Sequence, residues 1–94
     1  MRETEILLTP RQIGLAVRTS TNQANRALRD LGYQWRDDHG DWRLADAGVP
    51  YGREFRGGRD NHMYYVRWRG AVVAEVQKAL ARQTAVEVLA GDPR

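Results

Sequence analysis

The stretch TSTNQANRALRDLG, Thr19–Gly32, has the pattern of a capped helix and guides the interpretation of the whole chain. Ser20 and Gln23 stand three residues apart, as in a capping box, where each side chain bonds the other residue's free backbone N–H. The apolar residues that follow recur at helical spacing and are Ala24, Ala27, Leu28 and Leu31. Gly32 supplies the left-handed residue at which we expect the helix to end.

A second helix start lies just before this stretch. Thr9 and Gln12 again stand three residues apart, and Pro10 occupies the first helical position, which proline favours. This helix is short, and we expect it to stop near Arg18. Two capped helices separated by about three residues cannot continue as one rod, so they turn sharply against each other in helix-turn-helix geometry.

The outer face of the second helix has the side chains of a DNA-recognition helix. With the apolar stripe turned inward, a rotation of about 100° per residue places polar and basic groups on the other side. We predict that base edges of double-stranded DNA are faced by Asn22, Gln23, Asn25, Arg26 and Arg29. We predict that phosphates are contacted by Ser20, Thr21, Arg11 and Arg18. The alternative is an ordinary surface helix, which also carries polar groups opposite its apolar stripe.

After Gly32 the hydrophobic period changes from helical to alternating. Two alternating stretches, 33–36 and 41–44, flank turn residues and predict a β-hairpin whose larger side chains are Tyr33, Trp35, Trp42 and Leu44. A hairpin directly after such a helix pair is a wing. We therefore predict an α+β winged helix-turn-helix domain over 1–94, divided into the helix-turn-helix and wing (5–45), a loop (46–62), a strand that joins the hairpin's sheet (63–69) and a longer C-terminal helix (70–90).

Length and composition set the class of protein. The 94 residues include no cysteine, which excludes disulfides and thiolate zinc sites. The core must come from aliphatic residues, with Trp35, Trp42 and Trp68 as its large pieces. No apolar run has membrane-spanning length and no signal peptide precedes the domain, so we expect a soluble, cytoplasmic protein. The net charge of +3 permits nucleic-acid binding without requiring it.

Several runs of this sequence resemble the KilAC-type C-terminal domain of phage antirepressors. The runs are LLTPRQIGLAV (7–17), STNQANRALRDLGYQW (20–35), DWRLADAG (41–48) and YYVRW (64–68). The most specific pieces are Leu8-Thr9-Pro10, 25–32, Trp42 and Val66-Arg67-Trp68. The resemblance covers Leu7 to about Leu80 and implies a phage or prophage winged-helix protein of the antirepressor or transcription-regulator type. In that family a separate N-terminal module usually precedes the domain, whereas here Met1 lies just before the first apolar segment.

The tip of the predicted hairpin is acidic, which disfavours its approach to DNA. Asp37, Asp38 and Asp41 surround His39, and a wing that follows phosphates is expected to be basic. One interpretation is that these aspartates only form the turn. The other is that the main partner is a protein. The second function hypothesis is therefore a small phage inhibitor, of antirepressor or anti-defence (anti-CRISPR-like) type, that binds a host or phage regulatory or defence protein.

The basic residues of the second half lie among aromatics and glycines. We predict phosphate positioning by Arg53, Arg56 and Arg59. The same composition suits base stacking, a protein interface rich in Arg and Tyr, or a solvated connector. The apolar residues Val86, Val88 and Leu89 near the C-terminus need cover, which predicts a homodimer through the last helix.

Catalysis finds little support in the sequence. His39 and His62 are the only imidazoles, and both fall in predicted loops. No nucleophile–base arrangement, paired carboxylates or phosphate-binding glycine loop can be placed on a scaffold. We expect a protein that is not an enzyme and that uses no cofactor, catalytic residue or metal.

Overall fold

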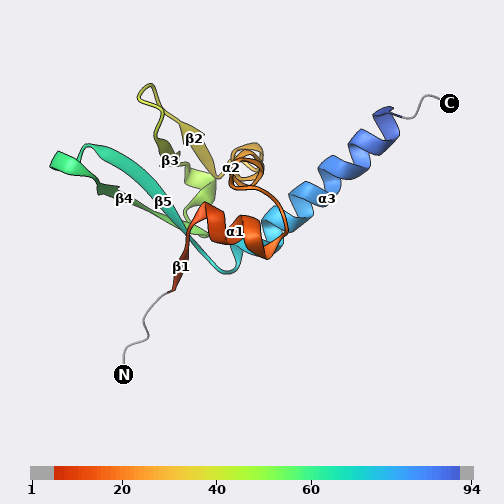
Figure 1. Ribbon diagram of the computed structural model, residues 1–94, viewed down its shortest axis with the longest axis horizontal. Coiled ribbons are helices and arrows are strands. Elements are labelled where there is room, and N and C mark those ends of the chain that lie inside the picture. The colour runs from red at the N-terminus through yellow and green to blue at the C-terminus, as the bar shows by residue number, and fades with distance from the viewer. Residues whose placement is uncertain (1–5, 92–94) are drawn as a thin grey trace.

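The computed structural model describes residues 6–91 and, within them, every side chain except those of Asn61 and 84–91. Three helices are present: α1 (Pro10–Ala16), α2 (Thr21–Asp30) and α3 (Val72–Gly91). Five strands accompany them: β1 (Leu7–Leu8), β2 (Gln34–Arg36), β3 (Trp42–Leu44), β4 (Gly52–Gly57) and β5 (Met63–Arg69). Figure 1 shows the hairpins at one end of the molecule and α3 extending away from the other. The mixed α+β class is as predicted.

The turn between α1 and α2 is tight, as the two cap signals predicted. Thr9 accepts the backbone N–H of Gln12 at 3.1 Å while the Gln12 side chain accepts that of Thr9 at 2.8 Å, so the first capping box is complete. The helix ends with Arg18 in the left-handed region (φ 62°) and with a 2.7 Å hydrogen bond from Thr19 N to Gly14 O. The two helices are therefore separate and cross at a corner.

The caps of α2 are confirmed only in part. Ser20 Oγ accepts the N–H of Gln23 at 3.1 Å, but the reciprocal bond is not formed, and Gln23 Oε1 is buried with no hydrogen-bond partner among the described residues. The second capping box is thus half made. At the other end Gly32 has φ 80°, and Tyr33 N donates to Leu28 O at 3.0 Å. This is the glycine-terminated helix end that the sequence predicted.

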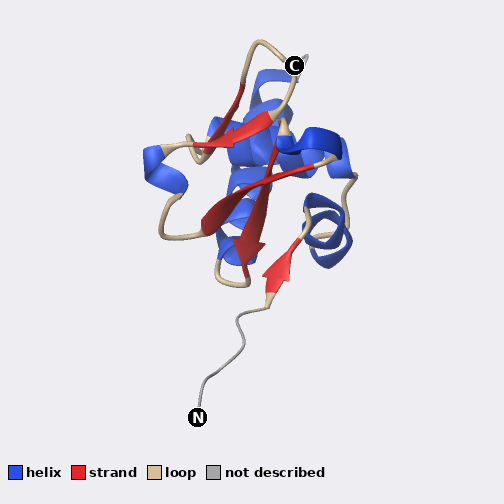
Figure 2. Ribbon diagram, turned by 90° about the vertical axis from the view of Figure 1, so that its left-hand side faces the viewer, coloured by secondary structure: helices blue, strands red, loops and turns tan. Residues whose placement is uncertain are grey.

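The strands form two sheets rather than one. The predicted hairpin exists as β2–β3, with Trp35 opposite Arg43 and Arg36 opposite Trp42. The prediction that 63–69 joins this sheet is wrong, because β5 pairs with β4 on one side and β1 on the other, in the order β1-β5-β4. The arrangement is consistent with a winged-helix-like fold that carries two hairpins (Figure 2).

The predicted loop over 46–62 is also wrong, because it contains β4. Its glycines suggested a turn, yet two of them lie in the strand where aromatic rings approach the backbone. A Cβ on Gly52 would lie 2.8 Å from the Trp68 ring, and one on Gly57 would lie 2.8 Å from the Tyr65 ring. These glycines mark close packing, and of the predicted loop only 46–51 and 58–62 lie outside β4, each with a short 3-10 turn, at 46–48 and 59–61.

The core lies between the helices and the inner face of the β1-β5-β4 sheet. Its buried residues are Ile13, Ala24, Ala27, Leu28, Val66, Trp68, Val72 and Val76. Of the three tryptophans expected there, only Trp68 is fully buried. Trp35 is 47% exposed, and Trp42 is half-buried beside α2. Through this core, the apolar stripe of α2 faces the sheet and its polar side faces outward.

Candidate nucleic-acid interface

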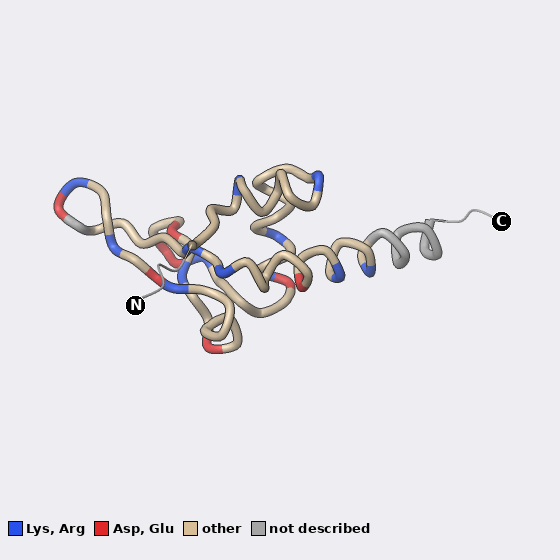
Figure 3. Tube along the Cα trace, turned by 90° about the horizontal axis from the view of Figure 1, so that it is seen from below, with Lys and Arg blue, Asp and Glu red and all other residues tan. Residues whose placement is uncertain are grey.

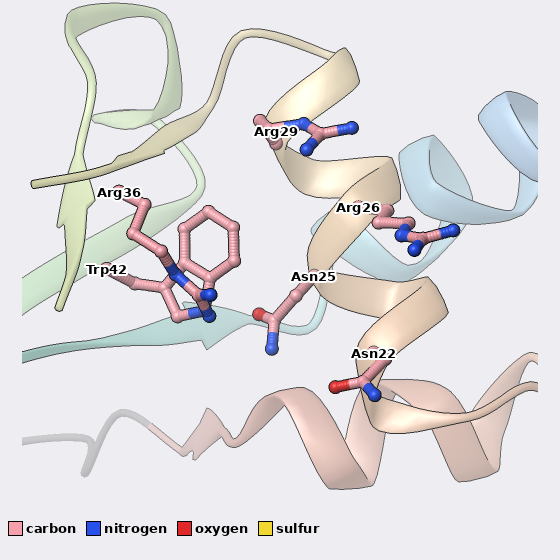
Figure 4. Close-up of a pocket in the computed structure, with 6 residues that line it drawn as sticks. All are labelled: Asn22, Asn25, Arg26, Arg29, Arg36 and Trp42. Carbon is pink, nitrogen blue, oxygen red and sulfur yellow. The ribbon is translucent and has the colours of Figure 1, made fainter. Parts of the chain in front are cut away.

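A groove runs between the outer face of α2 and the β2–β3 hairpin (Figure 4). Its volume is about 360 Å³, and its lining residues are Asn22, Asn25, Arg26, Arg29, Arg36 and Trp42. The groove therefore brings four of the predicted base-facing residues together. It adds two residues of the hairpin that the sequence did not identify as part of a site.

The α2 side of the groove is accessible. Asn22, Arg26 and Arg29 are exposed, as predicted from the position of the apolar stripe. Arg29 Nη2 lies 3.2 Å from Asp30 Oδ1, but both side chains are more than half exposed, so this ion pair is weak and screened. Arg29 can exchange Asp30 for an anionic ligand at little cost.

Asn25 is held in one orientation by the hairpin. Gln34 is 2% exposed, and its Nε2 donates to Asn25 Oδ1 at 3.0 Å and to Asn25 O at 3.1 Å. Because Asn25 Oδ1 already accepts one hydrogen bond, the amide nitrogen is the more available side-chain atom for a ligand. Asn25 is thus suited to donate from its amide nitrogen to an acceptor on a ligand.

The opposite wall of the groove is an arginine stacked on a tryptophan. The Arg36 guanidinium carbon lies 4.4 Å from the centre of the Trp42 ring, and the two residues are directly opposed in the hairpin. Stacking fixes the guanidinium plane while its N–H edge stays available to acceptors. A hairpin over 33–44 places Arg36 opposite Trp42, so the pair could be predicted from the sequence. Nothing in the nearby sequence predicts that this hairpin packs beside α2.

The groove attracts anions. Three arginines and two asparagines line it, and no carboxylate is among the lining residues. Planar guanidinium groups match phosphate and guanine acceptors geometrically. The electrostatics therefore favour a ligand that presents both phosphates and base edges.

The remaining predicted contact residues lie outside the groove. Ser20 and Thr21 are exposed at the start of α2, and Arg11 and Arg18 are exposed on α1 and the corner. Gln23 is partly buried and its side-chain oxygen is fully buried, so that oxygen is not accessible to a ligand.

Arg53, Arg56 and Arg59 lie on β4 and the turn after it, away from the groove lining. That turn, at the far left of Figure 3, carries both charge signs. It is therefore a poorer phosphate site than the sequence suggested.

Asp37 stabilises the turn at the hairpin tip, which supports the interpretation that the acidic residues there are turn formers. Asp37 Oδ1 accepts the N–H groups of His39 at 2.9 Å and Asp41 at 3.0 Å. Burial acts to raise the pKa of Asp37, but these backbone hydrogen bonds outweigh it and hold the pKa below its usual range. Asp41 Oδ2 accepts the N–H of Tyr64 at 3.2 Å. Two of the three carboxylates that motivated a protein partner are therefore structural.

Arg43 joins the two hairpins. Its Nε lies 3.1 Å from Glu54 Oε1, its Nη1 lies 3.6 Å from Asp37 Oδ2, and its guanidinium carbon lies 3.7 Å from the centre of the Tyr64 ring. Burial acts to raise the pKa of Glu54, but the Arg43 and Leu44 donors lower it overall. These contacts hold the groove wall against the larger sheet.

We expect this junction to loosen in acid. Because the pKa values of Glu54 and Asp37 are lowered by folding, their contribution to stability is present at neutral pH and is lost as the pH falls below about 4. The urea midpoint of the wild type should be level from about pH 7 to pH 5 and then fall. Glu54→Gln should be less stable at neutral pH and show a shallower fall, whereas Asp38→Asn should keep the wild-type profile. If the urea midpoint changes with pH in the same way in all three proteins, Glu54 does not stabilise this junction.

The described residues contain no group of three or more His, Cys, Asp or Glu placed to hold a metal ion. His39, Asp41, His62 and Met63 line a second hollow of about 440 Å³ between the two hairpin turns. Among the helices in the described part of the chain, none is long and apolar enough to cross a bilayer.

Comparison of the chain with protein-family models, with curated proteins and with solved structures gives no match. The resemblance to KilAC-type domains therefore stays a prediction.

Proposed function

We propose that this protein binds double-stranded DNA, with α2 in the major groove. The observation that carries the proposal is the groove with three arginines, two asparagines and no carboxylate along the outer face of a capped helix. An α-helix fits the major groove, where Arg reads guanine and Asn reads adenine. The function is thus binding and not catalysis.

The two walls of the groove have different roles in this proposal. Asn22 and Arg26, exposed on α2, face base edges. Arg36, stacked on Trp42, contacts the phosphates of the DNA strand that lies between α2 and the β2–β3 hairpin. Base contacts give sequence preference and phosphate contacts give position, so one groove supplies both.

The regulatory setting follows from the resemblance to KilAC-type domains. We place the protein among phage or prophage regulators that act on DNA in the cytoplasm of the host cell. A homodimer through α3 remains part of the proposal, and the side chains of Val86, Val88 and Leu89 that motivated it lie outside the described ones.

Measuring duplex affinity against salt tests the proposal. Sites would first be selected from a random duplex library with the full chain. The logarithm of the binding constant should fall with the logarithm of the salt concentration, with a slope of about −0.9 per phosphate contact. Arg26→Ala should cost about 1–3 kcal/mol and relax base preference, whereas Arg36→Ala should weaken all sequences alike and reduce the slope by about one.

Arg82→Ala, an exposed change on α3, is the matched control and should bind like the wild type. A flat salt response, or unchanged affinity in Arg26→Ala, contradicts DNA binding by α2. The function would then pass to the protein-binding inhibitor that the hairpin carboxylates first suggested.

A further inference from the structure

Gln34 is a buried polar side chain at the inner end of the groove. It lies opposite Leu44 in the β2–β3 hairpin, on the face that also carries Arg36 and Trp42, and Leu44 packs against the core. Gln34 is 2% exposed, so its amide is shielded from bulk water. Its Nε2 donates to Asn25 Oδ1 at 3.0 Å and to Asn25 O at 3.1 Å. These two hydrogen bonds join the hairpin to α2 at a residue that lines the groove.

The two hydrogen bonds allow only one orientation of each amide group. A backbone carbonyl accepts hydrogen bonds and cannot donate them, so the Gln34 atom beside Asn25 O must be the amide nitrogen. That nitrogen only donates, so the Asn25 atom that faces it must be the oxygen Oδ1. Figure 4 shows the Asn25 side chain projecting from α2 toward the hairpin wall of the groove. The backbone carbonyl thus sets, through Gln34, which end of the Asn25 amide is turned away from the hairpin bond.

Gln34 carries a cost in stability that an apolar residue would avoid. Its Oε1 is buried with no hydrogen-bond partner among the described residues, and a buried acceptor without a donor loses its hydration without compensation. Asn25 O lies within the hydrogen-bond ladder of α2, so this carbonyl does not depend on the Gln34 donor. An apolar side chain of similar length at position 34 would therefore serve folding at least as well.

We infer that Gln34 is a positioning residue that sets which bases Asn25 accepts, an inference that rests on the proposed binding of duplex DNA. In the major groove guanine, adenine and thymine each present an acceptor, whereas cytosine presents only its N4 donor. An asparagine held with its N–H groups toward the base edge pairs with the first three and meets cytosine donor to donor. The groove therefore rejects cytosine at one position. Without Gln34, Asn25 can turn its oxygen toward the cytosine donor, and the rejection is lost.

The test measures base preference at the position that Asn25 contacts. Duplex sites selected with the full chain are altered one base at a time, and the contacted position is the one whose preference disappears in Asn25→Ala. Cytosine at this position should weaken wild-type binding about tenfold, within the range for one mismatched base pair. In Gln34→Met this penalty should largely disappear, while the other positions and the salt slope keep their wild-type values. The double variant should match Asn25→Ala, because the two residues act through one contact.

Stability separates positioning from a purely structural role. Gln34→Met removes the unpaired Oε1 and fills its space with an unbranched apolar side chain, so its urea midpoint should equal or exceed that of the wild type. The same substitution at an exposed glutamine of α3, Gln77→Met, is the matched control and should keep both wild-type stability and wild-type base preference. A stable Gln34→Met that accepts cytosine is the result expected of a positioning residue.

A measurement without DNA tests the orientation directly. In ¹⁵N relaxation of the free wild-type protein, the side-chain amide of Asn25 should be nearly as rigid as the backbone of α2, whereas that of the exposed Asn22 should be mobile. A mobile Asn25 amide, or an unchanged cytosine penalty in Gln34→Met, would overturn the inference and leave the proposal that α2 binds DNA in place. A wild type that binds no duplex would overturn the proposed function and the base selection with it, while the amide measurement would still show whether Gln34 fixes Asn25.

Discussion

Trp68→Ala is expected to remove a large part of the folding free energy of this protein. Trp68 is fully buried on β5, contacts the backbone of Gly52, and belongs to the same cluster as Ile13, Leu28 and Val72. Replacing a buried tryptophan by alanine costs about 3–5 kcal/mol, against a total of about 5–15 kcal/mol for a domain. In urea denaturation the midpoint should fall by about 2 M, since the slope for small proteins is about 1–3 kcal/mol per molar.

Two other substitutions make the prediction specific to burial. Trp35 is 47% exposed, so Trp35→Ala should shift the midpoint far less. Trp68 Nε1 is buried with no hydrogen-bond partner among the described residues. Trp68→Phe removes this unpaired donor as well as some volume, and should therefore cost much less than Trp68→Ala. Similar losses at Trp35 and Trp68 would show that the core does not lie where the structure places it.

The contrast between these tryptophans shows which features of the structure could be predicted from the sequence and which could not. The three look alike in a hydrophobic pattern, and only packing between distant segments buries Trp68, leaves Trp42 half-buried beside α2 and leaves Trp35 47% exposed. Helix starts were predictable because the Thr9 and Ser20 caps act within three residues. The strand β4 was not predictable, because its glycines were interpreted as turn formers and because the strand that it pairs with, β5, follows the next turn. The groove residues of α2 could be predicted from the angle between successive residues of a helix. Arg36 and Trp42 could not, because they reach the groove only through the position of the hairpin relative to α2.

Gly14→Val is the second substitution with a large expected effect, because it acts on the corner between α1 and α2. A Cβ at this buried position would lie 2.8 Å from Thr19 O and 3.1 Å from Ser20 O, both backbone atoms. Backbone cannot move aside as a flexible side chain can, so α2 and its Ser20 cap must shift. Overpacking of this kind costs about 1–3 kcal/mol, and the two γ-carbons of valine add to it. Urea denaturation should show the loss, and duplex affinity should fall although no groove residue is changed.

Two other glycines separate steric from conformational causes. Gly70 has open space around it, so Gly70→Ala should be nearly neutral in both stability and binding. Gly32 also has open space but φ +80°, so Gly32→Ala should cost about 1–2 kcal/mol through backbone strain alone. If Gly14→Val folds with wild-type stability, the close approach of α1 to the turn is wrong. If it loses stability yet binds duplex normally, the angle between α1 and α2 does not position the groove, and the packing of α2 against the β2–β3 hairpin alone must hold it in place.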